Sequence, residues 1–140
     1  MDDSIARYRS ASEAGDIAGL AEALAPEVEL VSPISGRMVF AGRDDVSFLL
    51  RAVYGTLKEV RWTETVGEGE CRILLGQARI GPVRMTDAMV FHLGADGRIR
   101  RISPHLRPWL ALTLFALVLG PQVSRRPGVV WRALRGARGS

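Results

Sequence analysis

Between residues 60 and 103, apolar and polar positions recur mainly with a period of two, which is typical of β-strands with one buried face. In the clearest strand that face carries Met85, Asp87, Met89, Phe91 and Leu93. The turn that follows contains Asp96-Gly97, and both residues tolerate the positive φ angles of a tight hairpin. The pattern therefore predicts strands at residues 60–66, 71–80, 85–93 and 98–103, of which the last two form a hairpin.

The first half of the chain has helical spacing instead. Apolar positions three and four residues apart predict helices over residues 2–14 and 17–24, and a third helix with Val46, Leu49, Leu50 and Val53 on its buried face. Asp16 is placed to cap the second helix, and Pro26 marks its end. Short strands are expected at residues 28–31 and 39–40. This order of elements indicates an α+β fold, in which three N-terminal helices pack on one face of a curved antiparallel sheet.

The C-terminal segment, residues 105–140, has a different pattern. Residues 109–119 are apolar except for one threonine, and this block is too short to span a bilayer as a helix. Beyond it, Val130, Trp131 and Leu134 alternate with Arg132, Arg135 and Arg138, which predicts a short basic amphipathic helix. We expect a domain over residues 1–104 followed by this helical tail. The tail either lies on an anionic membrane surface or docks on the domain or on a second copy of the chain.

Charge is divided in the same way. The net charge is +4, but residues 1–104 contain 13 Arg and Lys against 15 Asp and Glu, whereas residues 105–140 contain six Arg and no acidic residue. The basic character thus belongs to the tail, and because no nucleic-acid-binding motif accompanies it we expect no nucleic-acid partner. The single cysteine, Cys71, excludes an intramolecular disulfide and fits a reducing compartment. The polar N-terminus does not have the pattern of a signal peptide, so we expect a cytoplasmic protein.

Asp87 is the main functional candidate in the predicted sheet. A lone carboxyl on a face of Met and Phe side chains must be paired, must border a cavity or must stay protonated, because burying a free carboxylate is prohibitive. This position predicts a pocket with Asp87 in its wall. The alternative is a carboxyl at the entrance of the strand that faces water.

Several motifs together resemble the nuclear transport factor 2 fold superfamily, which includes ketosteroid isomerases and SnoaL-like polyketide cyclases. They cover roughly residues 4–104, and they are Tyr8, Ala14-Gly15-Asp16, Ala25-Pro26-Glu27-Val28, Ser32-Pro33, Gly42-Arg43, and Asp87 with Asp96-Gly97-Arg98-Ile99. The resemblance implies a cone-shaped sheet around a deep apolar pocket that the helices close. It also implies a small apolar ligand, such as a steroid- or polyketide-like compound. Independently of the resemblance, a homodimer is a partner to test, because the C-terminal segment could dock on a second copy of the chain.

The resemblance implies roles for individual residues as well. In ketosteroid isomerases a tyrosine and a protonated aspartic acid donate hydrogen bonds to the enolate oxygen, and Tyr8 and Asp87 match these two positions. The base that moves the proton would stand before Pro33, where this chain has Ser32. The side chains implied to line the pocket are those of Trp62, Met85, Met89 and Phe91.

Two further residues are candidates for a substitute base. Glu64 shares the strand parity of Trp62, although it could instead pair with Arg79. His105 follows Pro104, near the position where polyketide cyclases of this fold carry their acid-base aspartate, although a solvated histidine is the alternative. We expect no cofactor and no metal site. Two functions stay open: an enzyme that acts by enolate-type proton transfer, and a non-catalytic binding or interaction protein of the same fold.

Overall fold

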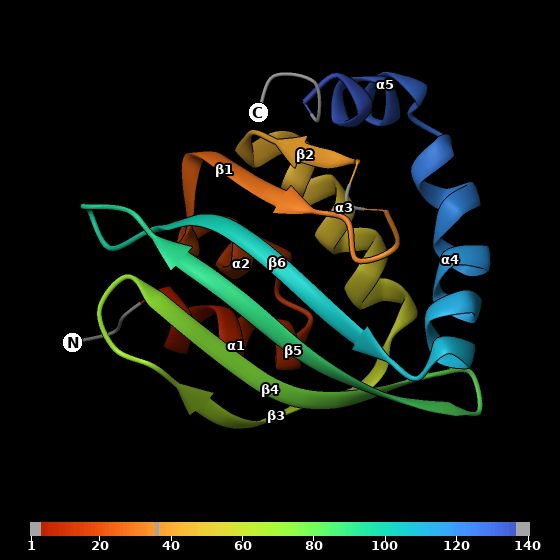
Figure 1. Ribbon diagram of the computed structural model, residues 1–140, viewed down its shortest axis with the longest axis horizontal. Helices are drawn as coiled ribbons and strands as arrows, with labels where there is room; N and C mark the ends of the chain where they lie inside the picture. The colour runs from red at the N-terminus through yellow and green to blue at the C-terminus, as the bar shows by residue number, and fades with distance from the viewer. Residues whose placement is uncertain (1–3, 36, 137–140) are drawn as a thin grey trace.

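The computed structural model describes residues 4–35 and 37–136 and contains one curved, unclosed sheet with helices on one side (Figure 1). The helices are α1 (Ser4–Ala14), α2 (Ile17–Ala23), α3 (Arg43–Thr56), α4 (Trp109–Ser124) and α5 (Pro127–Gly136). The strands are β1 (Leu24–Val31), β2 (Val39–Ala41), β3 (Lys58–Val66), β4 (Cys71–Ile80), β5 (Val83–Leu93) and β6 (Ile99–Arg107). The expected α+β fold with a curved sheet is thereby confirmed.

The strands follow the order β2-β1-β6-β5-β4-β3 across the sheet. All neighbouring strands are antiparallel except β1 and β6, which run parallel. In Figure 1, α1, α2 and α3 lie behind the sheet, α4 runs along one side and α5 crosses the top. The side chains between the helices and the sheet form one continuous apolar core.

The β5–β6 hairpin has the predicted parity and turn. Met85, Met89, Phe91 and Leu93 are buried on the face toward the helices, as the period of two requires. At the tip Gly97 has a φ of 81°, and the backbone N–H of Arg98 donates to Oδ1 of Asp96 over 3.0 Å. The alternation in the sequence therefore places Asp87 correctly on the inner face of β5.

The junction between α2 and β1 differs in part from the prediction. Asp16 caps α2 as expected, since its Oδ1 accepts the backbone N–H of Gly19 over 3.0 Å. However, β1 already begins at Leu24 and contains Pro26, whereas the strand was expected from residue 28. The register between β1 and β6 shifts between Leu24 and Glu29, and such an irregularity accommodates a residue without a backbone N–H.

Helix α4 is longer than the apolar block predicted, because it continues through Gly120 and Pro121 to Ser124. A proline inside a helix costs roughly 3 kcal/mol. Leu119 and Val123 are buried on either side of it, and burial of such side chains stabilises by about 1.5–3 kcal/mol each. Burial of Val123, which lies beyond the proline, therefore offsets a large part of this cost in the last turn of the helix.

Both C-terminal helices pack on the domain. Ala111, Phe115, Leu119 and Val123 of α4, together with Val129 and Ala133 of α5, belong to the same core as α1 and the sheet. Arg132 of α5 forms two hydrogen bonds of 2.9 Å to the carboxylate of Asp45 on α3. No helix among the described residues is long and apolar enough to cross a membrane. Arg138, predicted as part of the basic helix, lies outside the described residues, as do residues 2 and 3 of the first predicted helix.

Candidate functional site

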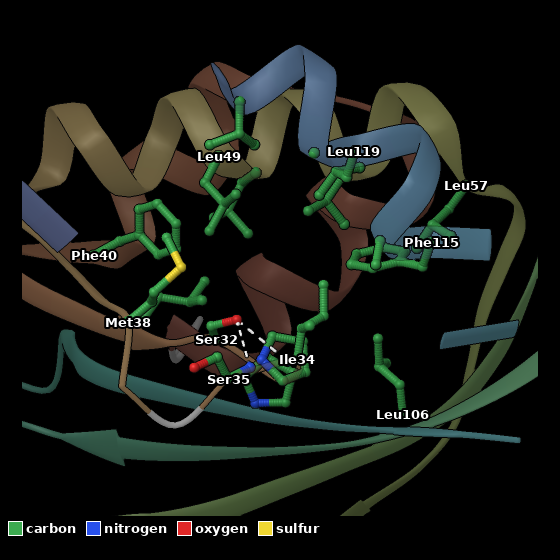
Figure 2. Close-up of a pocket in the computed structure, with 18 of the residues that line it drawn as sticks. Ser32, Ile34, Ser35, Met38, Phe40, Leu49, Leu57, Leu106, Phe115 and Leu119 are labelled. Carbon is green, nitrogen blue, oxygen red and sulfur yellow. Dashed lines mark hydrogen bonds between the residues drawn. The ribbon is translucent and has the colours of Figure 1, made fainter. Parts of the chain in front are cut away.

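A cavity of about 290 Å³ lies between the inner face of the sheet and helices α3 and α4. Figure 2 shows Leu106 on the sheet side and Leu49, Phe115 and Leu119 on the helix side of this space. The loop between β1 and β2 contributes Ser32, Pro33, Ile34, Ser35 and Met38. Strands, helices and the β1–β2 loop thus all contribute to the wall, and apolar side chains dominate it.

Few polar side chains reach the cavity. Among the described residues, those that line it are Ser32, Ser35, Tyr54, Asp87 and Ser124. Asp87 and Tyr54 are the ionisable groups among them, and Asp87 contributes the carboxyl group. The described residues contain no group of three His, Cys, Asp or Glu side chains placed to hold a metal ion.

The Asp87 carboxyl is held in an environment that disfavours its charge. Its Oδ1 atom is buried and has no hydrogen-bond partner among residues 4–35 and 37–136. Burial raises the pKa of Asp87 from 3.8 to about 7, although a hydrogen bond from the backbone N–H of His105 acts in the opposite direction. At neutral pH the carboxyl is therefore divided between a neutral form that can donate a hydrogen bond and a charged form that can only accept one.

Tyr54 and Tyr8 form a hydroxyl pair beside the cavity. Their Oη atoms are 2.8 Å apart, and the rings meet edge to face with centroids separated by 6.2 Å. Burial raises the pKa of both phenols, and the negative charge of Asp87 raises them further. Both hydroxyls therefore remain protonated donors at neutral pH. Tyr54 lines the cavity, whereas Tyr8 is fully buried behind it and supports Tyr54.

Ser32 lines the cavity, but its hydroxyl oxygen organises the loop. It accepts backbone N–H groups from Ile34 and from Ser35, each over 3.2 Å (Figure 2). This is the turn geometry that a serine before a loop commonly adopts. The contacts fix the β1–β2 loop against the cavity and supply no group that activates the hydroxyl as a base.

The predicted apolar lining residues divide into one that borders the cavity and three that do not. Met89 lines it. Met85 and Phe91 are buried core residues, and the ring of Phe91 packs edge to face against Tyr8 at 4.9 Å. Trp62 is buried against α1, where its Nε1 donates to Oγ of Ser12 over 2.8 Å. Of the residues predicted for the site, Ser32, Asp87 and Met89 thus meet at the cavity.

Glu64 is exposed and points away from the cavity, because β3 contains a bulge. Trp62 pairs with Gly76, but Glu64 pairs with Leu75, so one extra residue on β3 reverses the parity between them. The inward orientation expected from simple alternation is therefore wrong. The expected alternative partner, Arg79, instead forms an ion pair with Glu59 at 2.8 Å.

His105 lies on the outer face of the sheet. In the register of β5 and β6 it stands opposite Ala88, whereas Leu106 stands opposite Asp87 and lines the cavity. Its exposed ring has Nδ1 at 3.1 Å from the carbonyl oxygen of Ser103 and 3.3 Å from that of Ala88. The ring is therefore separated from the cavity by the sheet, and the backbone N–H, not the imidazole, reaches Asp87.

Sequence reasoning missed two parts of the site. Tyr54 follows Leu50 by four residues, and this helical spacing could have placed it on the inner face of α3 beside the cavity. The wall formed by Phe115, Leu119 and Val123 of α4 was also missed, although their spacing of four residues is visible in the sequence. The block is apolar on all sides, so its pattern does not distinguish the face that would close a cavity.

The comparisons with known proteins agree with this architecture. The SnoaL-like domain family matches residues 5–102. An uncharacterized protein with a cystatin-like fold from Silicibacter pomeroyi is 23% identical, with a TM-score of 0.86 and 93% of each chain covered. A steroid delta-isomerase from Pseudomonas aeruginosa is 24% identical, with a TM-score of 0.76 and 89% of each chain covered.

A proposed polyketide cyclase from Sinorhizobium meliloti has a TM-score of 0.63 at 19% identity, and the match covers 75% of this chain and 95% of that one. No curated protein matches the sequence. At these identities the solved structures show a shared fold and no more. The family match, by contrast, extends over well more than half of the chain. The protein therefore belongs to the SnoaL-like domain family and has the nuclear transport factor 2-like fold.

Proposed function

We propose that the cavity binds one small, largely apolar molecule that carries a carbonyl or hydroxyl group. The observation that supports this most directly is Oδ1 of Asp87, a buried polar atom without a hydrogen-bond partner among the described residues. Buried polar groups in proteins are nearly always hydrogen-bonded, so a ligand atom at this position would complete the site. The apolar remainder of the wall would contact the apolar body of the ligand.

The two ionisable groups of the wall, Asp87 and Tyr54, suit an oxygen atom of the ligand. Neutral Asp87 donates to a carbonyl, and charged Asp87 accepts from a hydroxyl. The Tyr54 hydroxyl, already hydrogen-bonded to Tyr8, stays protonated and is the second donor. A steroid- or polyketide-like compound has this combination of an apolar skeleton and a ketone or enol oxygen. The names of two structural neighbours, a steroid delta-isomerase and a proposed polyketide cyclase, are in line with this class.

The second candidate is an enzyme of the enolate type, in which Asp87 and the tyrosine pair stabilise the enolate oxygen. The arrangement of Asp87, Tyr54 and Tyr8 favours it. Against it, the described lining residues include no second carboxylate and no histidine that could move the proton. Binding without turnover is therefore the function we favour. Isomerisation of a β,γ-unsaturated steroid ketone faster than in a protein-free control would reverse that preference.

Calorimetric titration with a steroid ketone and with the corresponding hydrocarbon, which lacks the oxygen, tests the binding proposal. We expect the ketone to bind about 3- to 10-fold more tightly, the value of one net hydrogen bond. Asp87→Ala should reduce this difference, because only the Tyr54 hydroxyl then remains to contact the ligand oxygen, whereas Asp96→Asn, which removes an exposed carboxyl at the hairpin tip, should preserve it. Equal affinities of the wild type for the two compounds would contradict the role of Asp87. Absence of binding by either would contradict the proposed ligand class.

A further inference from the structure

The side of α4 that faces away from the domain is apolar and uncovered. We call the side chains of Trp109, Leu110, Leu117 and Val118 the outer face of α4. Trp109 is 75% exposed and Leu117 67% exposed, and the other two are exposed as well. In Figure 1 the helix forms one edge of the molecule, and no other helix or strand of the described residues lies beyond it. Large apolar side chains gathered on one exposed helix usually mark an interaction surface.

The outer face has almost no hydrogen-bonding capacity to offer to water. Thr113, an exposed polar residue of the same helix, donates its hydroxyl to the backbone carbonyl of Trp109 over 2.8 Å. The opposite side of the helix is buried in the domain through Phe115 and Leu119. A helix that is apolar on both sides needs an apolar environment on both, and the domain supplies it on one side only.

Arginines stand at both ends of the outer face. Arg107 precedes α4, Arg125 and Arg126 follow it, and all three are exposed. Residues 105–140 contain no acidic side chain that would neutralise them. In α5, Trp131 is 59% exposed and lies under the guanidinium of Arg135 at 4.6 Å. Exposed tryptophan beside arginine is typical of segments that lie at the interface between lipid headgroups and acyl chains.

We propose that the outer face of α4, flanked by Arg107 and Arg125, docks on an anionic lipid surface with the helix lying in the plane of the interface. Apolar side chains and several positive charges are the two signals that together give stable but reversible attachment. The positive charge favours an anionic lipid surface over a second copy of this chain as the partner. Two copies that met through this face would bring like-charged arginines together. The inner face of the same helix lines the cavity, so attachment would bring the cavity within one helix of the lipid.

Co-sedimentation of the full chain with vesicles tests the proposal. We expect binding to vesicles of phosphatidylcholine with phosphatidylglycerol, weaker binding to phosphatidylcholine alone, and a decrease as salt is raised. The emission of Trp109 should shift to the blue on binding, because this side chain leaves water. Leu117→Gln should weaken binding at least several-fold, since it removes apolar area from the interface. Val66→Gln, which changes an exposed apolar residue on β3, should bind like the wild type.

A second pair of variants isolates the charge. Arg125→Gln should weaken binding to the anionic vesicles about five-fold, the value of one basic side chain near the surface. Arg98→Gln, at the tip of the distant β5–β6 hairpin, should have no effect. Absence of the wild type from the anionic pellet, or equal binding by Leu117→Gln and Val66→Gln, would overturn the proposal. It would also be overturned by a dimer in solution that Leu117→Gln converts to a monomer, because a second copy would then occupy the face.

Discussion

At the scale of single residues, the Asp87 carboxyl couples the candidate site to the stability of the protein, because burial raises its pKa. Its pKa of about 7 means that the folded chain binds a proton that the unfolded chain, with a carboxyl of ordinary pKa, has already released. A folded-state pKa raised above the unfolded value disfavours folding once the pH exceeds the unfolded pKa. The raised pKa therefore lowers the stability of the folded protein and keeps part of the Asp87 population neutral near physiological pH.

The first prediction concerns the effect of this raised pKa on stability. Between about pH 4 and pH 7 the stability of the wild type should fall as the pH rises and then level off, by about 1.4 kcal/mol for each pH unit at most. Asp87→Asn cannot titrate, so its stability relative to the wild type should grow over the same range. Urea unfolding at a series of pH values measures this. A constant difference between the two proteins from pH 4 to pH 8 would mean that the pKa of Asp87 is not raised.

At the scale of elements, the bulge in β3 decides which residues reach the interior. It follows Trp62, whose ring covers Gly76 of the neighbouring strand. A Cβ atom added at Gly76 would lie 2.5 Å from Cε3 of Trp62 and 2.7 Å from the backbone oxygen of Arg61. The absence of a side chain at Gly76 therefore leaves room for the indole of Trp62 against β4. The position of the indole depends on the glycine.

The second prediction follows from that close approach. Gly76→Ala should destabilise the protein by about 1–3 kcal/mol, because either the indole or the strand must move. Gly55→Ala is the matched control, since a Cβ atom there meets nothing within 4 Å and the residue lies in α3. It should be neutral or stabilise by up to about 1 kcal/mol. Equal thermal midpoints for the two variants would show that Trp62 does not lie against Gly76.

The sequence predicts elements well where the evidence is local. The alternation in β5, the Asp16 cap and the hairpin at Gly97 each depend on a few neighbouring residues, and each is found in the structure. Glu64 was misplaced because a bulge is a property of two paired strands, and the pattern of one strand does not show it. The full length of α4 depends on packing of Leu119 and Val123 against elements distant in sequence.

The candidate site was predictable to a smaller extent than the fold. Asp87 stood out because a charged residue interrupted an apolar face, which is a local signal. Tyr54 did not, since a tyrosine on a helix is equally suited to a core or to a cavity wall. The role of Tyr8 behind Tyr54 depends on how α1 and α3 approach each other, and the sequence does not contain that distance directly.

At the scale of the whole molecule, the C-terminal helices and the N-terminal domain share one core. α4 contributes Ala111, Phe115 and Leu119, and α5 contributes Val129 and Ala133, to the cluster that also holds Tyr8 and Phe91. The ion pair between Arg132 and Asp45 and the stacking of Arg126 on Phe48 add contacts to α3. We therefore expect the protein to unfold in one cooperative transition.

The third prediction tests this shared core with two leucines of the same helix. Leu119→Ala should lower the free energy of unfolding by about 2–5 kcal/mol, the usual cost of truncating a buried leucine. Leu117→Ala, on the outer face, should change it by less than about 0.5 kcal/mol. Calorimetry should show a single transition for both variants. A low-temperature transition of α4 alone, with the rest of the protein unaffected by Leu119→Ala, would contradict a shared core.

The bulge in β3 also affects whether two copies of the protein can pair through the edges of their sheets. β3 is a terminal strand of the sheet, so its outer backbone groups are available to a strand from another chain. Two register shifts interrupt its pairing, Glu59 has a positive φ of 55°, and charged side chains recur along it at Lys58, Arg61 and Glu64. An irregular, charged edge is a poor template for a growing fibril. The distortion that turns Glu64 away from the cavity thus also protects the protein from polymerising edge to edge when it is concentrated.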